Sequence, residues 1–259
     1  MPMSTIRACY KALLVAGMFL YGIFAVSTIM PLLDIVLGRR AIVLHDYICL
    51  HWNRTVCRIL NVRIHVVGDP SPEARLWVAN HISWLDIIAL GSQQPMTFVA
   101  KQEVADWPVM GYLARRIGTL FVHRGDAERT GAIAERMTWQ LRQGRRLMLF
   151  PEGTTTQGTR VLRFHAKLLH PAQLAHVPVQ AVGLEYLDAA RQVAPFIGED
   201  EFLPHLLRIL QLGRVDLRLH YCQPLSAGLH RDVLAQTTRK QIVAALTPHT
   251  DAERRAAGI

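Results

Sequence analysis

The longest uncharged stretch of the chain runs from Ala12 to Leu33 and is apolar almost throughout. A helix of about 20 apolar residues crosses the hydrocarbon core of a bilayer, so this stretch is long enough to span a membrane or to insert deeply into one. We expect it to anchor the chain, with a kink or turn at Pro31. Residues 1–40 are accordingly predicted to form a hydrophobic N-terminal membrane anchor, and residues 41–259 a separate domain.

Two other interpretations of this stretch stay open. Small residues at Ala25 and Ser27 are typical of a signal-peptide cleavage site, and the core helix of a water-soluble domain would also be apolar. The stretch is longer than the usual apolar region of a signal peptide and continues past that site, which favours the anchor. Basic residues flank it, Arg7 and Lys11 before and residues 39 and 40 after, so the positive-inside rule leaves its orientation undecided.

Composition narrows the classes of function. The chain has 259 residues and a formal net charge of +9, which suits an anionic partner such as nucleic acid, an anionic membrane or a phosphorylated ligand. The basic residues are spread along the chain and no nucleic-acid-binding motif is present, so we expect no nucleic-acid partner. The four cysteines form no C-x-x-C pair, which argues against a disulfide framework or a zinc site.

After residue 60, short apolar segments alternate with helical patterns. Strands are predicted at residues 62–66, 76–79, 97–100, 120–122, 147–150, 177–184 and 215–219. Helices are predicted at residues 41–60, 106–116, 126–143, 202–212 and 233–246. This alternation predicts an α/β domain with a mixed, mainly buried β-sheet flanked by helices. The apolar stripe of residues 202–212 suits packing against the core, with contact to a membrane surface as the alternative.

A histidine and an aspartate lie five positions apart in the segment N-H-I-S-W-L-D, residues 80–86. On a continuous helix, five positions rotate by about 500°, which leaves the two side chains about 140° apart. His81 and Asp86 can meet if His81 lies in a loop before the helix and Asp86 reaches back from its first turn. Ser83 and Asp86 have the spacing of a capping box, which supports that geometry. A neutral imidazole could then take a proton from an attacking hydroxyl while the carboxylate fixes its tautomer.

The pair by itself is weak evidence for catalysis. An aspartate that only caps a helix, together with a polar histidine at the end of a strand, would give the same pattern. With 12 histidines, an aspartate at one fixed offset from one of them is roughly an even chance at a frequency of about one in twenty. The polar, glycine-rich segment 150–158 follows a predicted buried strand, and such loops let backbone N–H groups approach an anionic oxygen. Arg124 lies at a strand end, where a guanidinium can hold a phosphate. A plain turn and a surface charge remain the alternatives for these two features.

Together with the strand segment V-P-V at residues 177–179, and in this order, these features resemble the glycerolipid acyltransferase family, whose members acylate glycerol-3-phosphate and lysophospholipids. The resemblance extends over about residues 76–184. The motif N-H-x-S-x-x-D is matched at residues 80–86, and F-P-E-G-T is matched without a gap at residues 150–154. The segment K-Q-E at residues 101–103 is similar to the basic-acidic segment that the family carries between these motifs.

The resemblance implies an O-acyltransferase that works without a metal or a cofactor. His81 would act as the general base on the free hydroxyl of a lysophospholipid, and Asp86 would orient and polarise it. The hydroxyl oxygen would attack the thioester of acyl-CoA or acyl-carrier protein directly, with no acyl-enzyme intermediate. The resemblance assigns acceptor binding to five residues: Lys101, Arg124, Glu152, Gly153 and Thr154.

The resemblance also implies an acceptor and a location. We expect 1-acylglycerol-3-phosphate as the acceptor and phosphatidic acid as the product, with a lyso-ornithine lipid as the alternative. The chain departs from the common family pattern at His123, at Thr155-Thr156 and at Ala181, where the family usually has aspartate, arginine-serine and proline. The threonine pair, with residues 197–200, is similar to the lyso-ornithine lipid branch, whose acceptor is zwitterionic. The expected location is the inner, cytoplasmic membrane, with the active site facing the cytoplasm.

Two other classes of function fit these residues less well. A non-catalytic lipid- or membrane-binding protein with the same fold would not need to keep His81, Asp86 and Glu152. A hydrolase acting on thioesters or phospholipids is disfavoured because the sequence has no Gly-x-Ser-x-Gly nucleophile motif.

Overall fold

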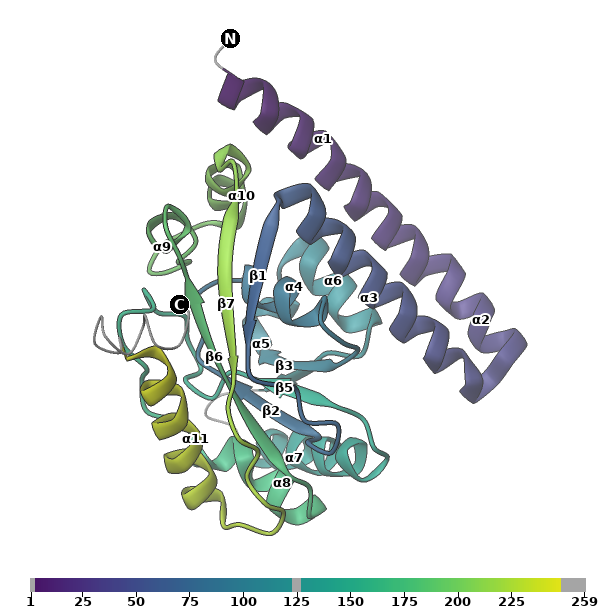
Figure 1. The fold of residues 1–259 in the computed structure, drawn as a ribbon. Helices are drawn as coiled ribbons and strands as arrows, with labels where there is room; N and C mark the ends of the chain where they lie inside the picture. Colours follow the sequence, from purple (N-terminus) through teal and green to yellow (C-terminus); the bar gives the residue numbers. More distant parts are fainter. Residues whose placement is uncertain (1–2, 123–126, 248–259) are drawn as a thin grey trace.

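The computed structural model describes residues 3–122 and 127–247, which fold around one central β-sheet (Figure 1). The sheet has seven strands in the order β1-β7-β6-β2-β5-β3-β4, and every neighbouring pair is parallel except β6 and β7. The strands are β1 (Val62–Val67), β2 (Leu76–Ala79), β3 (Thr97–Lys101), β4 (Leu120–Val122), β5 (Leu147–Leu149), β6 (Val179–Tyr186) and β7 (Val215–Tyr221). The expected mixed sheet is confirmed, with strand ends displaced by no more than a few residues.

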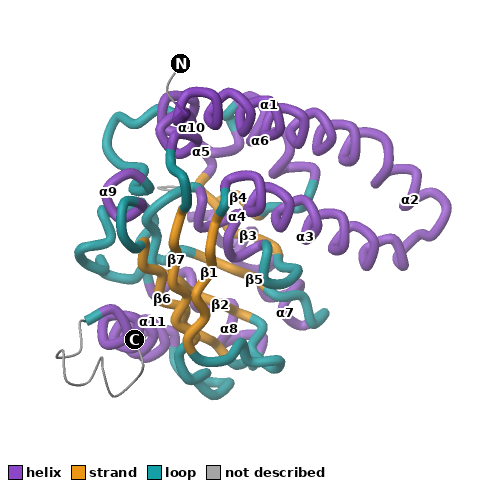
Figure 2. The backbone as a smooth tube through the Cα atoms, turned by 45° about the horizontal axis from the view of Figure 1, so that its top comes forward, coloured by secondary structure: helices purple, strands orange, loops and turns teal. Residues whose placement is uncertain are grey.

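Helices cover both faces of this sheet, so its central strands are buried on both sides. On β2, Trp77 and Ala79 face one core cluster, and Leu76 and Val78 face the other, as the pleat of a strand requires. The first cluster includes residues of α1, α3, α4, α9 and α10, and the second includes residues of α7, α8 and α11. Figure 2 shows α11 on the side of the sheet away from α1 and α3.

The helices have the following bounds. On the first face lie α1 (Met3–Phe24), α3 (Ala41–Leu60), α4 (Leu85–Gly91), α9 (Ala190–Val193) and α10 (Phe202–Gln211). On the second face lie α7 (Ala127–Arg142), α8 (His170–Ala175) and α11 (Arg231–Leu246). The remaining α-helices are α2 (Met30–Leu37), α5 (Gln102–Ala105) and α6 (Pro108–Arg116). The helix predicted at residues 202–212 packs Leu206, Ile209 and Leu210 into the core and leaves Leu203 and Leu207 exposed.

The N-terminal helices form a long hairpin along one side of the sheet (Figure 1). A π-helical turn at Ala25–Ile29 joins α1 to α2, directly before Pro31. Proline lacks an N–H and its ring collides with the carbonyl four residues earlier, which the wider turn accommodates. The chain reverses at Gly38, where φ is +53°, so the expected turn is not at Pro31 itself. The boundary predicted at residue 40 falls in this reversal and stays a prediction.

The hairpin exposes large apolar side chains. Ile35, Val36 and Val43 are 81%, 75% and 69% exposed. The helical run from Thr5 to Leu60 contains a stretch that is long and apolar enough to cross a membrane, by length and composition alone. Exposed apolar side chains that gather on one element mark sites of contact with a membrane or another protein.

Lys11 ties this hairpin to the sheet domain. Its ammonium is buried and donates to the carbonyl oxygens of Leu60 at 3.1 Å and of Leu212 at 2.9 Å. These carbonyls lie at the C-terminal ends of α3 and α10, where helices carry unpaired acceptors and partial negative charge. Burial, with a smaller contribution from Arg7, lowers the pKa of Lys11 from its usual value. One cation therefore joins three helices.

We predict that Lys11→Met lowers the free energy of unfolding by about 1–3 kcal/mol, because the apolar stem remains while two carbonyls lose their donor. Urea denaturation of the detergent-solubilised protein measures this change. Lys167→Met removes an exposed ammonium and is the matched control, with an expected change within about 0.5 kcal/mol. Equal losses in both variants would contradict the assignment.

Candidate active site

The histidine and the aspartate singled out in the sequence meet at the carboxyl end of β2. His81 lies in the loop after β2, and Asp86 lies in the first turn of α4. The Nδ1 atom of His81 is 2.8 Å from Oδ2 of Asp86, so the prediction that the loop lets them meet is confirmed. A carboxylate only accepts hydrogen bonds, so Nδ1 of the neutral ring carries the proton and Nε2 is the basic nitrogen.

The Asp86 carboxylate is fully buried and satisfied by hydrogen bonds. Besides His81, its Oδ2 accepts from the backbone N–H groups of Ile82 at 2.7 Å and Ser83 at 2.9 Å. Its Oδ1 accepts from the hydroxyl of Tyr186 at 2.7 Å. These hydrogen bonds replace the hydration that the carboxylate loses on burial.

The local capping differs from the expectation. Helix α4 begins at Leu85 with Trp84 as its N-cap, and no side-chain hydrogen bond caps its first turn. The acidic half of the predicted capping box forms, because Asp86 accepts from the N–H of Ser83. The serine half is wrong: the helix begins after Ser83, so this side chain does not cap it. Asp86 therefore accepts hydrogen bonds both from the backbone of the loop and from the ring of His81.

The F-P-E-G-T segment also holds His81. Glu152 is buried, and its Oε1 accepts from the backbone N–H of His81 at 2.9 Å while Oε2 accepts from that of Leu162 at 2.7 Å. Burial raises the pKa of Glu152, and the two N–H groups oppose that shift. The Phe150 ring stacks on the imidazole, with ring centroids 3.9 Å apart and planes inclined by 11°. Ring and backbone of His81 are therefore both held from the loop after β5.

Two residues beside His81 have positioning contacts that the sequence analysis did not assign. The Asn80 side chain donates to the Leu184 carbonyl at 3.0 Å and accepts from the Leu184 N–H at 2.7 Å. The Thr156 N–H donates to the His81 carbonyl at 2.8 Å. The sequence signals for Asn80 were its place in the N-H-x-S-x-x-D motif and its position directly after an apolar strand, where a buried amide needs partners.

The remaining predicted site residues are distributed along the same edge of the sheet. Lys101 is the last residue of β3, and Gly153, with φ of +67°, and the exposed Thr154 follow β5. The strands β2, β5 and β3 are neighbours and parallel, so the segments after them meet at one edge. Arg124 lies outside the described residues. The structure therefore brings His81, Asp86 and Glu152 into contact, and places the others at that edge.

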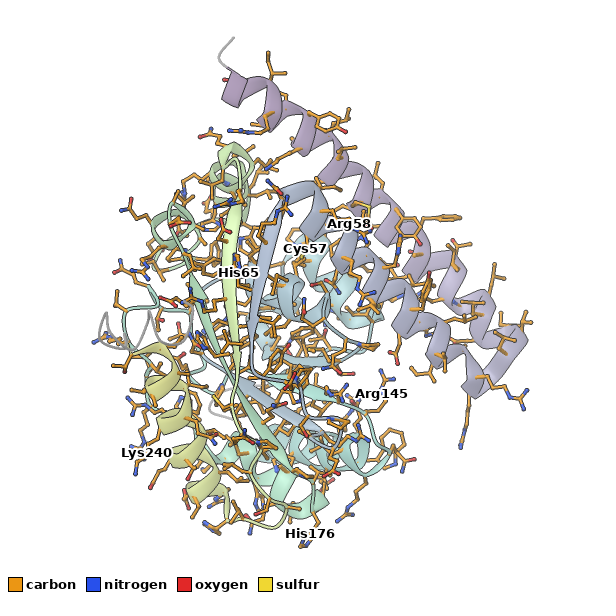
Figure 3. All side chains as sticks on the ribbon, viewed as in Figure 1. Cys57, Arg58, His65, Arg145, His176 and Lys240 are labelled. Carbon is orange, nitrogen blue, oxygen red and sulfur yellow. The ribbon has the colours of Figure 1, made fainter. Side chains whose placement is uncertain are left out.

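The buried thiol of Cys57 is unsuited to covalent catalysis. Cys57 on α3 (Figure 3) is 6% exposed, and burial raises the pKa of its thiol to about 11. A thiol nucleophile needs to be accessible and substantially ionised. The geometry around His81 is instead that of a general base, which removes a proton from a hydroxyl that itself attacks. Among the described residues, no group of three or more His, Cys, Asp and Glu side chains is placed to hold a metal ion.

We predict that Glu152→Gln lowers activity at least tenfold and the free energy of unfolding by about 1–3 kcal/mol, because an amide NH₂ would face a backbone donor. Assays of acyl transfer and urea denaturation measure the two effects. Glu73→Gln makes the same change at an exposed site before the amino end of β2, away from His81 at the carboxyl end, and serves as the control. If the two variants behave alike, Glu152 does not support His81.

Comparisons with known proteins show the family to which the chain is similar. The profile of a family described as Acyltransferase matches residues 63–185. A lyso-ornithine lipid O-acyltransferase of Pseudomonas aeruginosa is 41% identical over 198 residues, which cover 75% of this chain and 76% of that protein. A 1-acyl-sn-glycerol-3-phosphate acyltransferase of Neisseria meningitidis is 34% identical over 173 residues, which cover 65% and 68%.

A crystal structure shares the fold. The 1-acyl-sn-glycerophosphate acyltransferase of Thermotoga maritima matches with a TM-score of 0.64 over 96% of this chain and 100% of that chain, at 18% sequence identity. A match at this identity shows the fold alone. The identity to the Pseudomonas protein over three quarters of both chains shows more: this chain belongs to the acyltransferase family.

Proposed function

We propose that this protein transfers a fatty acyl group from an acyl thioester to the free hydroxyl of a lyso-ornithine lipid. The observation that carries the proposal is the 2.8 Å contact between His81 Nδ1 and Asp86 Oδ2, in a chain of this family. The contact turns Nε2 of His81 into a base that can accept a hydroxyl proton.

The proposed reaction proceeds in one ternary complex. Nε2 of His81 takes the proton of the acceptor hydroxyl as its oxygen attacks the thioester carbonyl, and Asp86 stabilises the imidazolium that forms. When the carbon–sulfur bond breaks, the imidazolium returns the proton to the leaving thiolate. The products are the acylated lipid and the free thiol of CoA or of acyl-carrier protein, both of which remain candidates for the donor.

The choice of acceptor rests on one relative and one side chain. The family resemblance of the sequence favours 1-acylglycerol-3-phosphate, but the relative with the higher identity is named for the lyso-ornithine lipid. Thr155 stands where the family usually has arginine, and its hydroxyl donates to the carbonyl of Phe196. This position therefore offers no guanidinium to a phosphate, which suits a zwitterionic head group. The Neisseria relative keeps 1-acylglycerol-3-phosphate as the second candidate.

The acceptor-binding roles of the other residues stay predictions. Lys101, Gly153 and Thr154 follow or end strands that meet at the edge where His81 lies, which supports their assignment. Arg124 remains a prediction from the resemblance alone.

We predict that the purified protein in mixed micelles acylates a lyso-ornithine lipid with a kcat/KM at least tenfold above that for 1-acylglycerol-3-phosphate, when each is supplied with a labelled acyl thioester. His81→Ala should lower this transfer at least 100-fold, as the loss of a general base does. His65→Ala, on the edge strand β1 (Figure 3), is the control and should leave transfer unchanged. Full transfer by His81→Ala would refute the mechanism, and preference for the phosphate acceptor would refute the head-group choice.

We also propose that the hairpin of α1, α2 and α3 holds the enzyme at a membrane. Its exposed apolar residues supply the contact surface, and both the acceptor and the product are lipids. The face of the membrane at which the site works stays a prediction.

The double variant Ile35→Asp, Val43→Asp should reduce co-sedimentation with vesicles of phosphatidylethanolamine and phosphatidylglycerol at least fivefold, since a charge in hydrocarbon is strongly unfavourable. Val233→Asp on α11 places a charge at a valine that is 47% exposed, on the other side of the sheet, and is the control. Unchanged binding of the double variant would show that the hairpin is not the membrane contact.

A further inference from the structure

A buried tyrosine contacts the aspartate of the His81–Asp86 pair. Tyr186 is the last residue of β6, is 2% exposed, and donates its hydroxyl proton to Oδ1 of Asp86 at 2.7 Å. We infer that Tyr186 is a positioning residue of the reaction, which acts through Asp86 to set the orientation and the basicity of His81. The inference rests on the proposed function, because it assumes that His81 is the base.

The two oxygens of the Asp86 carboxylate have different neighbours. Oδ2 takes all its donors from the loop that it closes: His81, Ile82 and Ser83. Oδ1 takes its donor from a different element, β6, through Tyr186. Donors on both oxygens fix the rotation of the carboxylate about its Cβ–Cγ bond, and terminal torsions of this kind are otherwise broad. The direction in which Oδ2 points determines how the imidazole is held.

The same strand also holds the residue before His81. Asn80 pairs with both backbone groups of Leu184, two positions before Tyr186 on β6. The strand itself is rigid, because it pairs with β2 on one side and with β7 on the other, where Tyr186 lies opposite Leu217. One strand therefore supports the site at two points, through Asn80 and through Tyr186.

Tyr186 remains a donor under assay conditions. Its burial, and then the neighbouring Asp86 carboxylate, raise its pKa well above the usual value. The ionisable groups that face this contact are His81 from the loop, Glu152 from the segment after β5, and Cys57 from α3. Cys57 stays neutral because burial raises its pKa to about 11.

The hydrogen bond from Tyr186 draws negative charge toward Oδ1. When it is lost, more charge stays on Oδ2 and stabilises the imidazolium of His81, and the neutral base then persists only at higher pH. The acid limb of the pH profile of kcat/KM should therefore move to higher pH. A looser carboxylate should also lower kcat with little effect on the KM for either substrate.

The test uses Tyr186→Phe in the full-length chain, with Tyr221→Phe as the matched control. Tyr221 is buried on the neighbouring strand β7, and its hydroxyl has no hydrogen-bond partner among the described residues. Tyr186→Phe should lower kcat about three- to tenfold and displace the acid limb upward by about half a pH unit. Tyr221→Phe should match the unchanged protein in both measurements.

Asp86→Asn distinguishes an effect of Tyr186 that passes through the carboxylate from an effect on the stability of the fold. In an Asp86→Asn background, Tyr186→Phe should cause no further loss, because its effect passes through the carboxylate. Equal fold losses in both backgrounds, or an acid limb that does not move, would overturn the inference, because a smaller folded fraction alone would give both of these results. If Tyr186→Phe is unchanged while His81→Ala is inactive, the inference fails and the proposed function stands. If His81→Ala remains fully active, the proposed function itself fails.

Discussion

The buried carboxylate of Asp86 is the group around which this site is built. An ionised carboxylate removed from water is strongly unfavourable unless hydrogen bonds replace its hydration. The imidazole of His81, two backbone N–H groups and the hydroxyl of Tyr186 provide them. Those donors come from the loop after β2 and from the end of β6, so these elements are held in one arrangement. The same contacts that satisfy the buried carboxylate orient the imidazole of His81.

The residue that follows the His81 loop also connects it to the helices that we propose to lie at the membrane. Trp84, which follows the loop, packs edge-on against Phe202 of α10 with ring centroids 5.1 Å apart, and Phe202 packs against Phe19 of α1 at 6.5 Å. The Trp84 indole donates to His205 of α10 at 3.0 Å, which fixes its position. A rigid aromatic path thus joins α1 to the loop that carries His81. Under the proposed function, an acceptor whose chains remain in lipid would meet His81 at this junction.

Local features of the sequence were predictable, and contacts across the sheet were not. The strands at residues 76–79 and 147–149 were found because burial on both faces makes them continuously apolar. The meeting of His81 and Asp86 was found because five positions suffice for a loop followed by a helix turn. Tyr186 was missed because it is 100 positions from Asp86, and their contact depends on β6 lying beside β2. The cap at Ser83 was wrong because α4 begins later, at Leu85.

In the proposed mechanism, His81 activates the lipid hydroxyl for direct attack on the thioester, and no acyl group becomes attached to the protein. A rapid-quench experiment with a labelled acyl thioester and no acceptor examines this step. With His81 as the general base, mass spectrometry of the denatured protein should find no covalently attached label, and transfer should occur in a single phase when the lysolipid is added. A stoichiometric acyl–protein adduct that the lysolipid then discharges would show that the acyl group passes through the protein and that the mechanism is wrong.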